Sequence, residues 1–437
     1  MKENTKSKGM LTFTIVWIGQ LISTLGSGLT SFALGIWIYQ ETGSATLFVI
    51  NILVWTLPNI LISPVVGVIS DRWDRRIVMI MGDSGAGLSS LFVILVLFLG
   101  DLQVWHIYVA TAVNSAFGAF QWPAFSAATS TLVPKKQLGR AAGMSQIGDA
   151  VSHFATPAIA GALYVSLGMK FILSVDMVTY LFALGTLLAV RFPRPKTSEE
   201  GQSQQGSFWT EALFGWKYIK ARPGLLGLLS VFATLNFLWS LTFPLLIPML
   251  LNMTTPDRVG LIESIGGLGM LISTLVMSAW GGPKRRILGI FIAESLSGVA
   301  AIFLGLRPSV VMIAAALFGM HLVFPTSNAN SQAIWQSKVA QDVQGRVFAI
   351  RRMIAFSIEP IAVILAGPLA ERIFEPLMME GGGLAGIFGG LLGVGPGRGI
   401  GLMFVLVGMV YVLASSVIVI HPRIRRVEVE LEDVVVS

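Results

Sequence analysis

The 437-residue chain contains 54% hydrophobic and only 12% charged residues, whereas charged residues make up about 25% of a typical soluble domain. This composition excludes a water-soluble globular protein. The net charge of +7 would suggest nucleic acid as a partner for a soluble chain, but in a membrane protein the positions of Lys and Arg matter more than their sum. The absence of cysteine excludes disulfide bonds, thiolate metal sites and a cysteine nucleophile.

Twelve apolar stretches are each long enough to cross about 30 Å of hydrocarbon as a helix. The first six lie within residues 9–40, 42–70, 77–100, 104–130, 141–165 and 171–190. The other six lie within 224–252, 259–279, 287–306, 310–335, 347–370 and 400–420. The sequence therefore predicts an all-α polytopic membrane protein with twelve transmembrane helices, and the length of the first stretch argues against a signal peptide.

The polar segment 191–222 divides these helices into two sets of six. It is rich in Pro, Ser, Gln and Glu and is typical of a linker. We expect an N-terminal half at 1–190, a cytoplasmic linker at 191–222, a C-terminal half at 223–421 and a cytoplasmic tail at 422–437. If the N-terminus is cytoplasmic, 25 of the 30 Lys and Arg residues lie on the cytoplasmic side, as the positive-inside rule requires.

An internal repeat supports this division. Arg75-Arg76-Ile77-Val78 precedes the third span and Arg285-Arg286-Ile287-Leu288 the ninth, 210 residues later. Asp83-Ser84 and Glu294-Ser295 follow at a separation of 211, and Gly139-Arg140 and Gly345-Arg346 at 206. Two pseudo-symmetric six-helix halves are typical of transporters that move a substrate through a site near the membrane midplane.

The stretch from Gly67 to Arg76 resembles the loop signature Gly-x-Leu-x-Asp-Arg-x-Gly-Arg-Arg of the major facilitator superfamily, and departs from it at Ile69 and Asp74. The resemblance implies the major facilitator fold and a conformational latch, for which Asp71 can cap a helix and pair with a nearby arginine. A simple anchor of positive charge is the alternative. The counterpart at 281–286 lacks the acid, so we expect it only to anchor. The predicted latch residues are Gly67, Asp71, Arg72, Arg75 and Arg76.

Residues 132–141 and 344–348 resemble the macrolide-efflux and enterobactin-exporter branch of that superfamily, and the likeness extends over 11–421. In the fifth span, Pro157 and Gly161 belong to a loose version of an element associated with exporters, so export is favoured over import. Related drug/proton antiporters carry an Arg in the fourth span, where this chain has Asn114-Ser115-Ala116-Phe117-Gly118. Any proton coupling must therefore use other groups.

Acidic residues within the membrane are candidates for function because they are costly to bury. Asp83 and Glu294 lie about two turns from Arg pairs, which favours structural ion pairs. Asp176 and Glu263 lie near the outer ends, where they are solvated or form a gate. The predicted proton-coupling residues are Asp149, His153 and Glu359, since Asp149 and His153 share a helix face and Glu359 lies deepest. The alternative is that these acids are tied to Arg346, Arg351 or Arg352.

The resemblance implies that spans one, four, seven and ten line the substrate cavity. Their amide and aromatic side chains suit a largely neutral, amphipathic organic molecule, although packing between helices is the alternative for most of them, and for His321 in particular. The cavity candidates are Gln20, Asn114, Phe117, Gln121, Trp122, Asn236, Trp239, His321 and Asn328.

The sequence contains no phosphate-binding loop and no cluster with metal-ligand spacing, so we expect neither an enzyme, nor a cofactor, nor a metal, nor a nucleic-acid partner. We predict a monomeric, proton-coupled exporter of a macrolide-like drug, siderophore or secondary metabolite. It would lie, surrounded by lipids, in a bacterial plasma (inner) membrane with both termini cytoplasmic. A lipid or lysolipid flippase on the same fold is the alternative; an importer, a passive channel or a membrane enzyme is less favoured.

Overall fold

The computed structural model describes residues 2–134, 137–190, 208–339 and 343–431. Within some helices, including positions 67–72, it describes the backbone but not the side chains. The described residues form helices and no strands. They divide into two compact units, Met1–Thr197 with Thr255–Ser264, and Ser198–Thr254 with Ile265–Ser437. The predicted boundaries of the linker and the tail stay a prediction.

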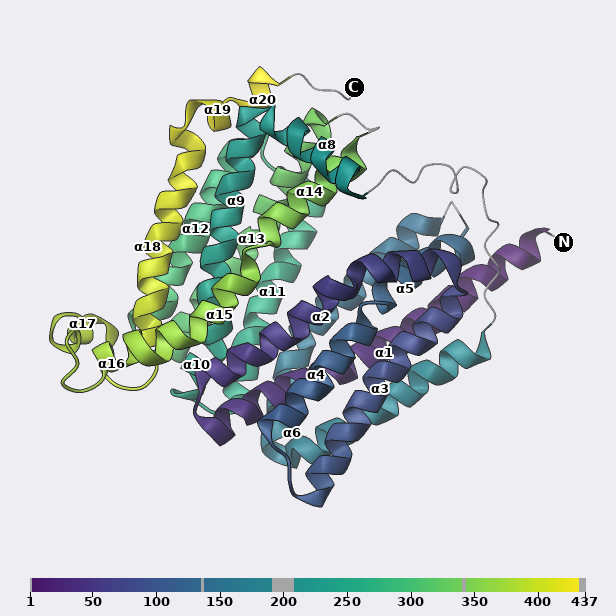
Figure 1. Cartoon of the computed structure of the whole chain (residues 1–437), viewed down its shortest axis with the longest axis horizontal. Coiled ribbons are helices and arrows are strands. Elements are labelled where there is room, and N and C mark those ends of the chain that lie inside the picture. Colours follow the sequence, from purple (N-terminus) through teal and green to yellow (C-terminus); the bar gives the residue numbers. More distant parts are fainter. Residues whose placement is uncertain (1, 135–136, 191–207, 340–342, 432–437) are drawn as a thin grey trace. The chain divides into compact units, whose positions relative to one another are not determined.

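The first unit consists of six long helices, with the beginning of α11 added to them (Figure 1). These helices are α1 (Lys2–Thr42), α2 (Ala45–Arg72), α3 (Arg75–Leu99), α4 (Val104–Gly118), α5 (Gln121–Leu132) and α6 (Leu138–Ala189). α6 contains two predicted spans, because Gly168 adopts a left-handed φ of 76° that interrupts the helix. Only glycine takes this conformation without strain, so Gly168 supplies the turn between the fifth and sixth spans.

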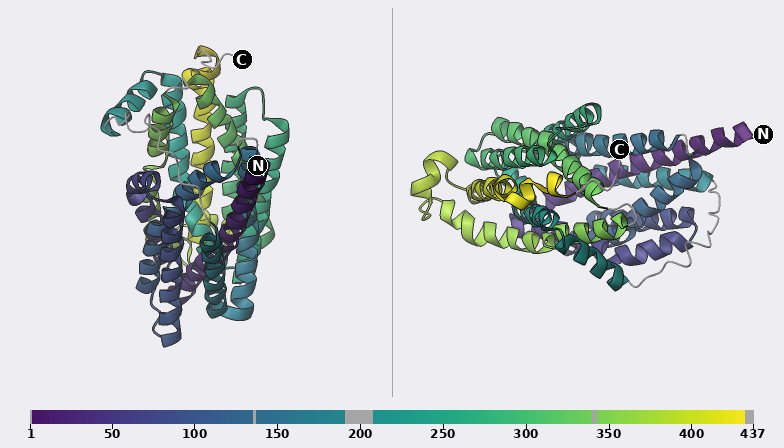
Figure 2. Two further views of the ribbon diagram at one scale, coloured as in Figure 1. Left: turned by 90° about the vertical axis from the view of Figure 1, so that its right-hand side faces the viewer. Right: turned by 90° about the horizontal axis from the view of Figure 1, so that it is seen from above.

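The second unit begins with the amphipathic helix α8 (Phe208–Lys220) and ends in two short helices (Figure 1). In between lie longer helices, several of them interrupted. They are α9 (Pro223–Thr242), η2 (Phe243–Leu245), α10 (Leu246–Leu251), α11 (Pro256–Trp280), α12 (Arg286–Leu306), α13 (Val310–Lys338), α14 (Gln344–Phe356), α15 (Glu359–Leu369), η3 (Ala370–Phe374), α16 (Glu375–Met378), α17 (Ala385–Leu392), α18 (Arg398–Ile420), α19 (Pro422–Arg425) and α20 (Val427–Glu430). The glycine-rich segment around α17 lies at the end of the unit opposite α19 and α20 (Figure 1), and the view from above shows it protruding to the side (Figure 2).

Ten helices of the described chain are long and apolar enough to cross a membrane. The helix at Val151–Ala189 counts once although it holds two predicted spans. The fourth predicted span is divided between α4 and α5, which are interrupted at Ala119 and Phe120. When the two spans of α6 are counted separately and the divided fourth span is added, the ten helices account for all twelve predicted helices.

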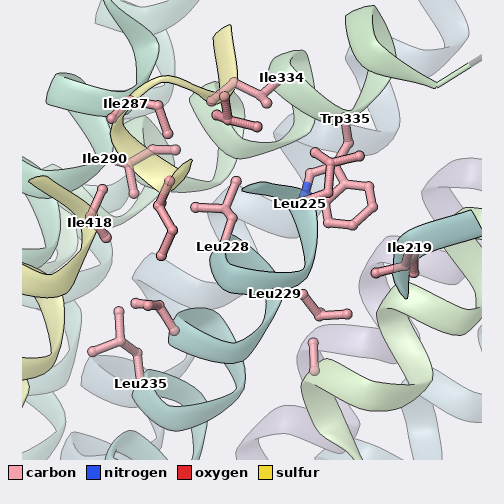
Figure 3. Close-up of a cluster of buried hydrophobic side chains, with 14 of the residues drawn as sticks. Ile219, Leu225, Leu228, Leu229, Leu235, Ile287, Ile290, Ile334, Trp335 and Ile418 are labelled. Carbon is pink, nitrogen blue, oxygen red and sulfur yellow. The ribbon is translucent and has the colours of Figure 1, made fainter. Parts of the chain in front are cut away.

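The core of the second unit is a continuous aliphatic cluster built by α9, α12, α13 and α18 (Figure 3). Leu228 and Leu229 follow Leu225 by three and four residues, about one turn of α9, and belong to the same cluster as Ile290 of α12 and the fully buried Trp335 of α13. Lipid tails are as apolar as these side chains, so burial adds less here than in water, and close packing has to hold the helices together.

Small residues allow that close packing between α12 and α18. A Cβ atom at Gly305 would overlap the carbonyl oxygen of Gly401, and one at Gly408 would lie 2.8 Å from the carbonyl oxygen of Gly298. Glycine at both levels lets the two backbones approach directly, as in other membrane helix pairs. This contact fixes α12 and α18 side by side, which positions the polar groups described below.

The C-terminal residues fasten the ends of α12 and α13. The Glu428 carboxylate accepts hydrogen bonds from the backbone N–H groups of Arg286 (3.1 Å) and Ile287 (3.1 Å) at the start of α12. Lys338 Nζ at the end of α13 donates to the carbonyl oxygen of Glu428 (2.6 Å). An anion at a helix N-terminus and a cation at a C-terminus are both favourable. Residues 281–286 contain no acid, and Glu428 from the C-terminal segment supplies the carboxylate at the start of α12 instead.

Candidate functional site

The second unit contains a cavity of about 530 Å³, which is within the range of pockets that hold drug-sized ligands. It is formed by α9, α12, α13, α14, α15 and α18. Aromatic side chains, three amides, two arginines and two glutamates line it, and these are Phe232, Asn236, Trp239, Glu294, Phe324, Asn328, Gln332, Trp335, Phe348, Arg351, Arg352, Phe356, Glu359 and Tyr411.

Trp239 anchors the aromatic part of this cavity. Its ring stacks on Phe243, with centroids 4.3 Å apart, and lies 6.5 Å from the ring of Phe324. The predicted cavity residue His321 packs edge-on against Trp239, and its Nδ1 is 3.0 Å from the carbonyl oxygen of Leu317. Stacked rings of this kind present a rigid apolar face, so Trp239 is held ready for a flat or bulky ligand.

Two predicted amides reach the same cavity and are fixed by backbone carbonyls. Asn236 Nδ2 donates to the carbonyl oxygen of Ala355 (3.0 Å), and Asn328 Nδ2 donates to that of Phe324 (3.3 Å). The structure therefore brings together three of the nine predicted cavity residues, Asn236, Trp239 and Asn328, in one lining. Each orients a polar group without adding charge.

Charged groups gather along α14 and the start of α15. Arg351 donates to Gln332 Oε1 and Ser331 Oγ, both at 2.9 Å, and its guanidinium lies 4.9 Å from the ring centroid of Trp335. Glu359, a predicted proton-coupling residue, is the first residue of α15, is half-buried and lines the cavity. Since Arg351 donates to neutral side chains, its positive charge is available to the cavity.

Glu294 is the deepest carboxyl group in this lining. Its side chain is 5% exposed, and it lies about 12 Å along α12 from Arg286. Ser327 Oγ donates to one carboxylate oxygen, and the Tyr411 hydroxyl donates to the other at 2.6 Å. The expected ion pair with a neighbouring Arg is wrong, because α12 turns this carboxyl toward hydroxyl groups on α13 and α18.

The first unit buries the equivalent acid, Asp83, in a different way. Gln20 Nε2 donates to Asp83 Oδ2 (2.9 Å), and Gln121 donates to Gln20 Oε1. Gln20 and Gln121 were predicted to line a cavity, but here they form an amide chain that ends on the 6%-exposed Asp83. Among the described contacts, the donor to Asp83 comes from α1 and not from the arginines with which an ion pair was expected.

Asp176 of α6 is buried as well, at 2% exposed, so the expectation that it is solvated is wrong, while a part in a gate stays a prediction. It accepts hydrogen bonds from Ser27 Oγ (3.1 Å) and Ser90 Oγ (2.7 Å).

A smaller cavity of about 300 Å³ lies in the same unit between α1, α2, α3 and α4, and the predicted residue Asn114 is part of its lining. Phe117, another predicted cavity residue, instead packs closely on Gly85 of α3.

The predicted latch is only partly described. Its stretch 67–72 is the end of helix α2, so the loop consists of little more than Trp73 and Asp74. The side chains of Gly67, Asp71 and Arg72 lie outside the described residues. Arg76 Nε and Nη2 donate to the carbonyl oxygens of Leu187 and Leu188, both at 2.7 Å, which places its positive charge at the C-terminal end of α6. Arg75 is half-buried beside it.

The element of α6 that was predicted to be of the exporter type packs against the beginning of α11 within the first unit. A Cβ at Gly260 would overlap the carbonyl oxygen of Pro157, and one at Gly161 would lie 2.5 Å from the carbonyl oxygen of Pro256. The backbone N–H of Ala158 donates to Ser264 Oγ (2.9 Å). Pro157 and Gly161 therefore form a close helix contact, as their small size predicts.

Of the remaining candidates, His153 is exposed, whereas the side chains of Asp149 and Trp122 lie outside the described residues. Among the residues that the structure describes there is no group of three or more His, Asp or Glu that could hold a metal ion. Sequence reasoning missed that Glu294 and Tyr411 line the cavity and that Ser327 donates a hydrogen bond to Glu294. The internal repeat could have indicated Glu294 and Ser327. Glu294 corresponds to Asp83 at an offset of 211 residues, and Ser327 corresponds to Gln121 at an offset of 206, which the repeat also contains.

Comparison with known proteins gives consistent matches over most of the chain. Residues 16–361 match the Major Facilitator Superfamily. Macrolide efflux protein A of Streptococcus pyogenes is 30% identical over 370 residues, which are 83% of this chain and 90% of that protein. Multidrug efflux pump Tap of Mycolicibacterium fortuitum is 24% identical over 84% of this chain and 90% of that protein.

Solved transporters share the fold at low sequence identity. A bacterial homologue of the human lysosomal transporter Spinster is 13% identical, with a TM-score of 0.66 over 94% of this chain and 98% of that one. A bacterial homologue of the iron transporter ferroportin is 15% identical, with a TM-score of 0.65 over 93% of this chain and 99% of that one. These two likenesses concern the fold alone.

Proposed function

The chain belongs to the Major Facilitator Superfamily, a family of transporters and not of enzymes, and we propose that it is a secondary active exporter that exchanges an amphipathic organic compound for protons. Relatives named as efflux proteins cover most of its length. We place it in a bacterial plasma membrane as a monomer with both termini cytoplasmic, which is the orientation that the distribution of Lys and Arg favours.

The observation that carries this proposal is the cavity of about 530 Å³ in the second unit. Its aromatic walls offer apolar contact area, while Asn236 and Asn328 offer oriented amides. A sugar or a small anion would leave most of the aromatic surface unused. A bulky, mainly apolar molecule with a few polar groups uses both kinds of lining, and macrolide-like drugs, siderophores and other secondary metabolites have this character.

Proton coupling is supported by carboxyl groups on the cavity wall. Glu359 and Glu294 line it, and exchange with protons requires a group that binds a proton in one state and releases it in the other. Asp149 with His153 stays a second proposed place for such a group. The latch of Gly67, Asp71, Arg72, Arg75 and Arg76 is proposed to hold one conformation, with Arg76 bound to the end of α6.

Efflux from a pump-deficient bacterial host that expresses the chain tests the proposal. The probes are erythromycin, a fluorescent hydrophobic dye and a fluorescent lysophospholipid, each with and without a protonophore. Protonophore-sensitive export of erythromycin or the dye supports the proposal. Export that persists with the protonophore contradicts secondary active transport driven by protons, and movement of the lysophospholipid alone favours the flippase.

A pair of tryptophan variants tests the cavity itself. Trp239→Ala removes the ring that stacks on Phe243, so we expect at least a tenfold loss of erythromycin export at an equal amount of protein in the membrane. Trp105→Ala is the matched control, because Trp105 is 54% exposed at the start of α4. Equal export by both variants would place the substrate elsewhere.

A further inference from the structure

The Glu294 carboxyl group differs from the buried Asp83 and Asp176 because it combines hydroxyl partners with a place in a cavity lining. Both of its oxygens accept a hydrogen bond from a hydroxyl group, one from Ser327 and one from Tyr411. It is 5% exposed and still belongs to the lining of the cavity of about 530 Å³. Because the group is otherwise enclosed by protein, the cavity is its route to water.

Hydroxyl partners can satisfy a carboxyl group in either protonation state. A hydroxyl both donates and accepts, whereas an amide N–H or a guanidinium only donates. When Glu294 is ionised, the two O–H groups donate to it as observed. When a proton adds to one of its oxygens, the new O–H can donate to the oxygen of Ser327 or Tyr411 after that hydroxyl rotates. The carboxyl group therefore keeps a hydrogen-bond partner on each oxygen in either state, so a change of state does not leave the carboxyl group unpaired.

The charged groups around Glu294 leave it without a fixed ionic partner among the described contacts. From α14 and α15, Arg351, Arg352 and Glu359 line the same cavity, and Arg351 donates to Gln332 and Ser331. α9 contributes the neutral Asn236 and Ser240.

Other titratable groups on the neighbouring helices bond elsewhere. Lys338 at the end of α13 donates to the carbonyl oxygen of Glu428, and His321 on α13 contacts the carbonyl oxygen of Leu317. On α12 itself, Arg286 donates to the carbonyl oxygen of Ala333. From α18, Tyr411 faces Glu294 directly. The positive charges of the cavity thus act on Glu294 through the cavity space, where a bound substrate can alter their effect.

We propose that Glu294, held by Ser327 and Tyr411, is the group that binds and releases the transported proton. The proton adds to one carboxylate oxygen and leaves from it, and no other bond forms or breaks. This inference rests on the proposed exchange with protons and names the residue responsible, in place of the Asp149–His153 pair and Glu359.

Infrared difference spectroscopy tests the proposal without any substrate. The full-length protein in lipid is taken from alkaline to acid pH, and the band of a protonated carboxyl group is recorded. We expect Glu294→Gln to lose one such component. Asp176→Asn is the matched control, because Asp176 is equally buried and bound by two serine hydroxyls but is absent from the lining of either cavity. A spectrum of Glu294→Gln identical to the wild-type spectrum overturns the proposal.

Tyr411→Phe provides a second variant in case Glu294→Gln does not fold. It removes one hydrogen bond and keeps the carboxyl group, so the carboxyl band should change frequency. An unchanged band would show that Glu294 is not the titrating group and overturns the proposal.

Transport separates this inference from the proposed function. In inside-out vesicles, Glu294→Gln should lose at least tenfold of the erythromycin accumulation driven by a pH difference. Wild-type vesicles that accumulate no probe contradict the proposed function, while the infrared result still decides the role of Glu294. Accumulation by Glu294→Gln at the wild-type level overturns the role of Glu294 alone.

Discussion

Asp83 in α3 and Glu294 in α12 lie 211 residues apart, at equivalent places in the internal repeat, but their partners differ in kind. Asp83 accepts from the amide of Gln20, which in turn accepts from Gln121. Glu294 accepts from the hydroxyls of Ser327 and Tyr411. The amide N–H of Gln20 donates to Asp83 as placed, whereas the hydroxyls beside Glu294 can donate or accept by rotation alone, so the second arrangement suits either protonation state.

The same pairing of positions extends to the helix ends. Asp74 Oδ1 accepts from the backbone N–H of Arg76 (2.9 Å) and caps α3 from within its own loop. At the start of α12, the corresponding N–H of Arg286 donates to Glu428, 142 residues away. The N-termini of α3 and α12 thus both have a carboxylate acceptor, which comes from the preceding loop in the first unit and from a residue distant in sequence in the second. The internal repeat therefore determines which helix end needs a carboxylate acceptor, but not which residue supplies it.

The largest expected effect comes from breaking the amide chain of the first unit. Gln20→Leu leaves the Asp83 carboxyl buried without its amide donor, which costs about 1–3 kcal/mol of stability. The measurement is the apparent midpoint of thermal unfolding in detergent. Gln40→Leu on the same helix is the control, because Gln40 is exposed and its change should stay within about 0.5 kcal/mol. Equal midpoints for the two variants would show that the amide chain does not stabilise the fold.

Removing the distant cap should have an intermediate effect. Glu428→Ala deprives two N–H groups of an acceptor, and the loss of such a cap costs about 1 kcal/mol. Hydrogen–deuterium exchange at Arg286 and Ile287 should accelerate by about fivefold.

Two further variants complete that comparison. Asp74→Ala should accelerate exchange at Arg76 and leave α12 unchanged, whereas Glu430→Ala, exposed on the same short helix as Glu428, should alter neither end. Fast exchange at Arg286 in the wild-type protein would contradict a role for Glu428 as a cap.

The smallest expected effect concerns the arginines at equivalent positions. Arg76→Lys replaces a forked guanidinium that reaches two carbonyl oxygens at 2.7 Å, and we expect a loss of about 0.5–1 kcal/mol. Arg286→Lys removes a single bond of 3.3 Å to Ala333 and should cost less. Thermal unfolding of the two variants under the same conditions measures the difference in stability. A larger loss of stability for Arg286→Lys would contradict the greater contribution expected from Arg76.

Hydropathy was sufficient to predict the helices, because each apolar stretch has to satisfy its backbone hydrogen bonds internally when it lies in lipid. It could not predict the interruption at Ala119–Phe120 or the division between α14 and α15. These breaks leave the local composition apolar, so they depend on packing with neighbouring helices. Spacing also could not assign Glu428 to α12, since the two segments are far apart in sequence.

In the candidate site, too, composition could predict the residues but not the contacts that depend on packing. Asn236, Trp239, Asn328 and Glu359 could be predicted from the apolar spans in which they occur, because amide, aromatic and acidic groups in such spans are few. The partners of Asp83 and Glu294 could not, because rotation of each helix about its axis decides whether an acid meets arginine, amide or hydroxyl. That rotation is set by contacts such as Gly298 with Gly408, which single-chain periodicity does not encode.

The long-range cap on α12 also has a consequence for biosynthesis. At translation rates of about 5–20 residues per second, the 142 residues between Arg286 and Glu428 emerge on the order of ten seconds after α12 begins. During that interval the first turn of α12 has its exposed N–H groups open to water, to lipid phosphate or to a chaperone. The second half therefore completes the cap of α12 only after Glu428 has been synthesised, whereas α3 is capped as soon as it is made.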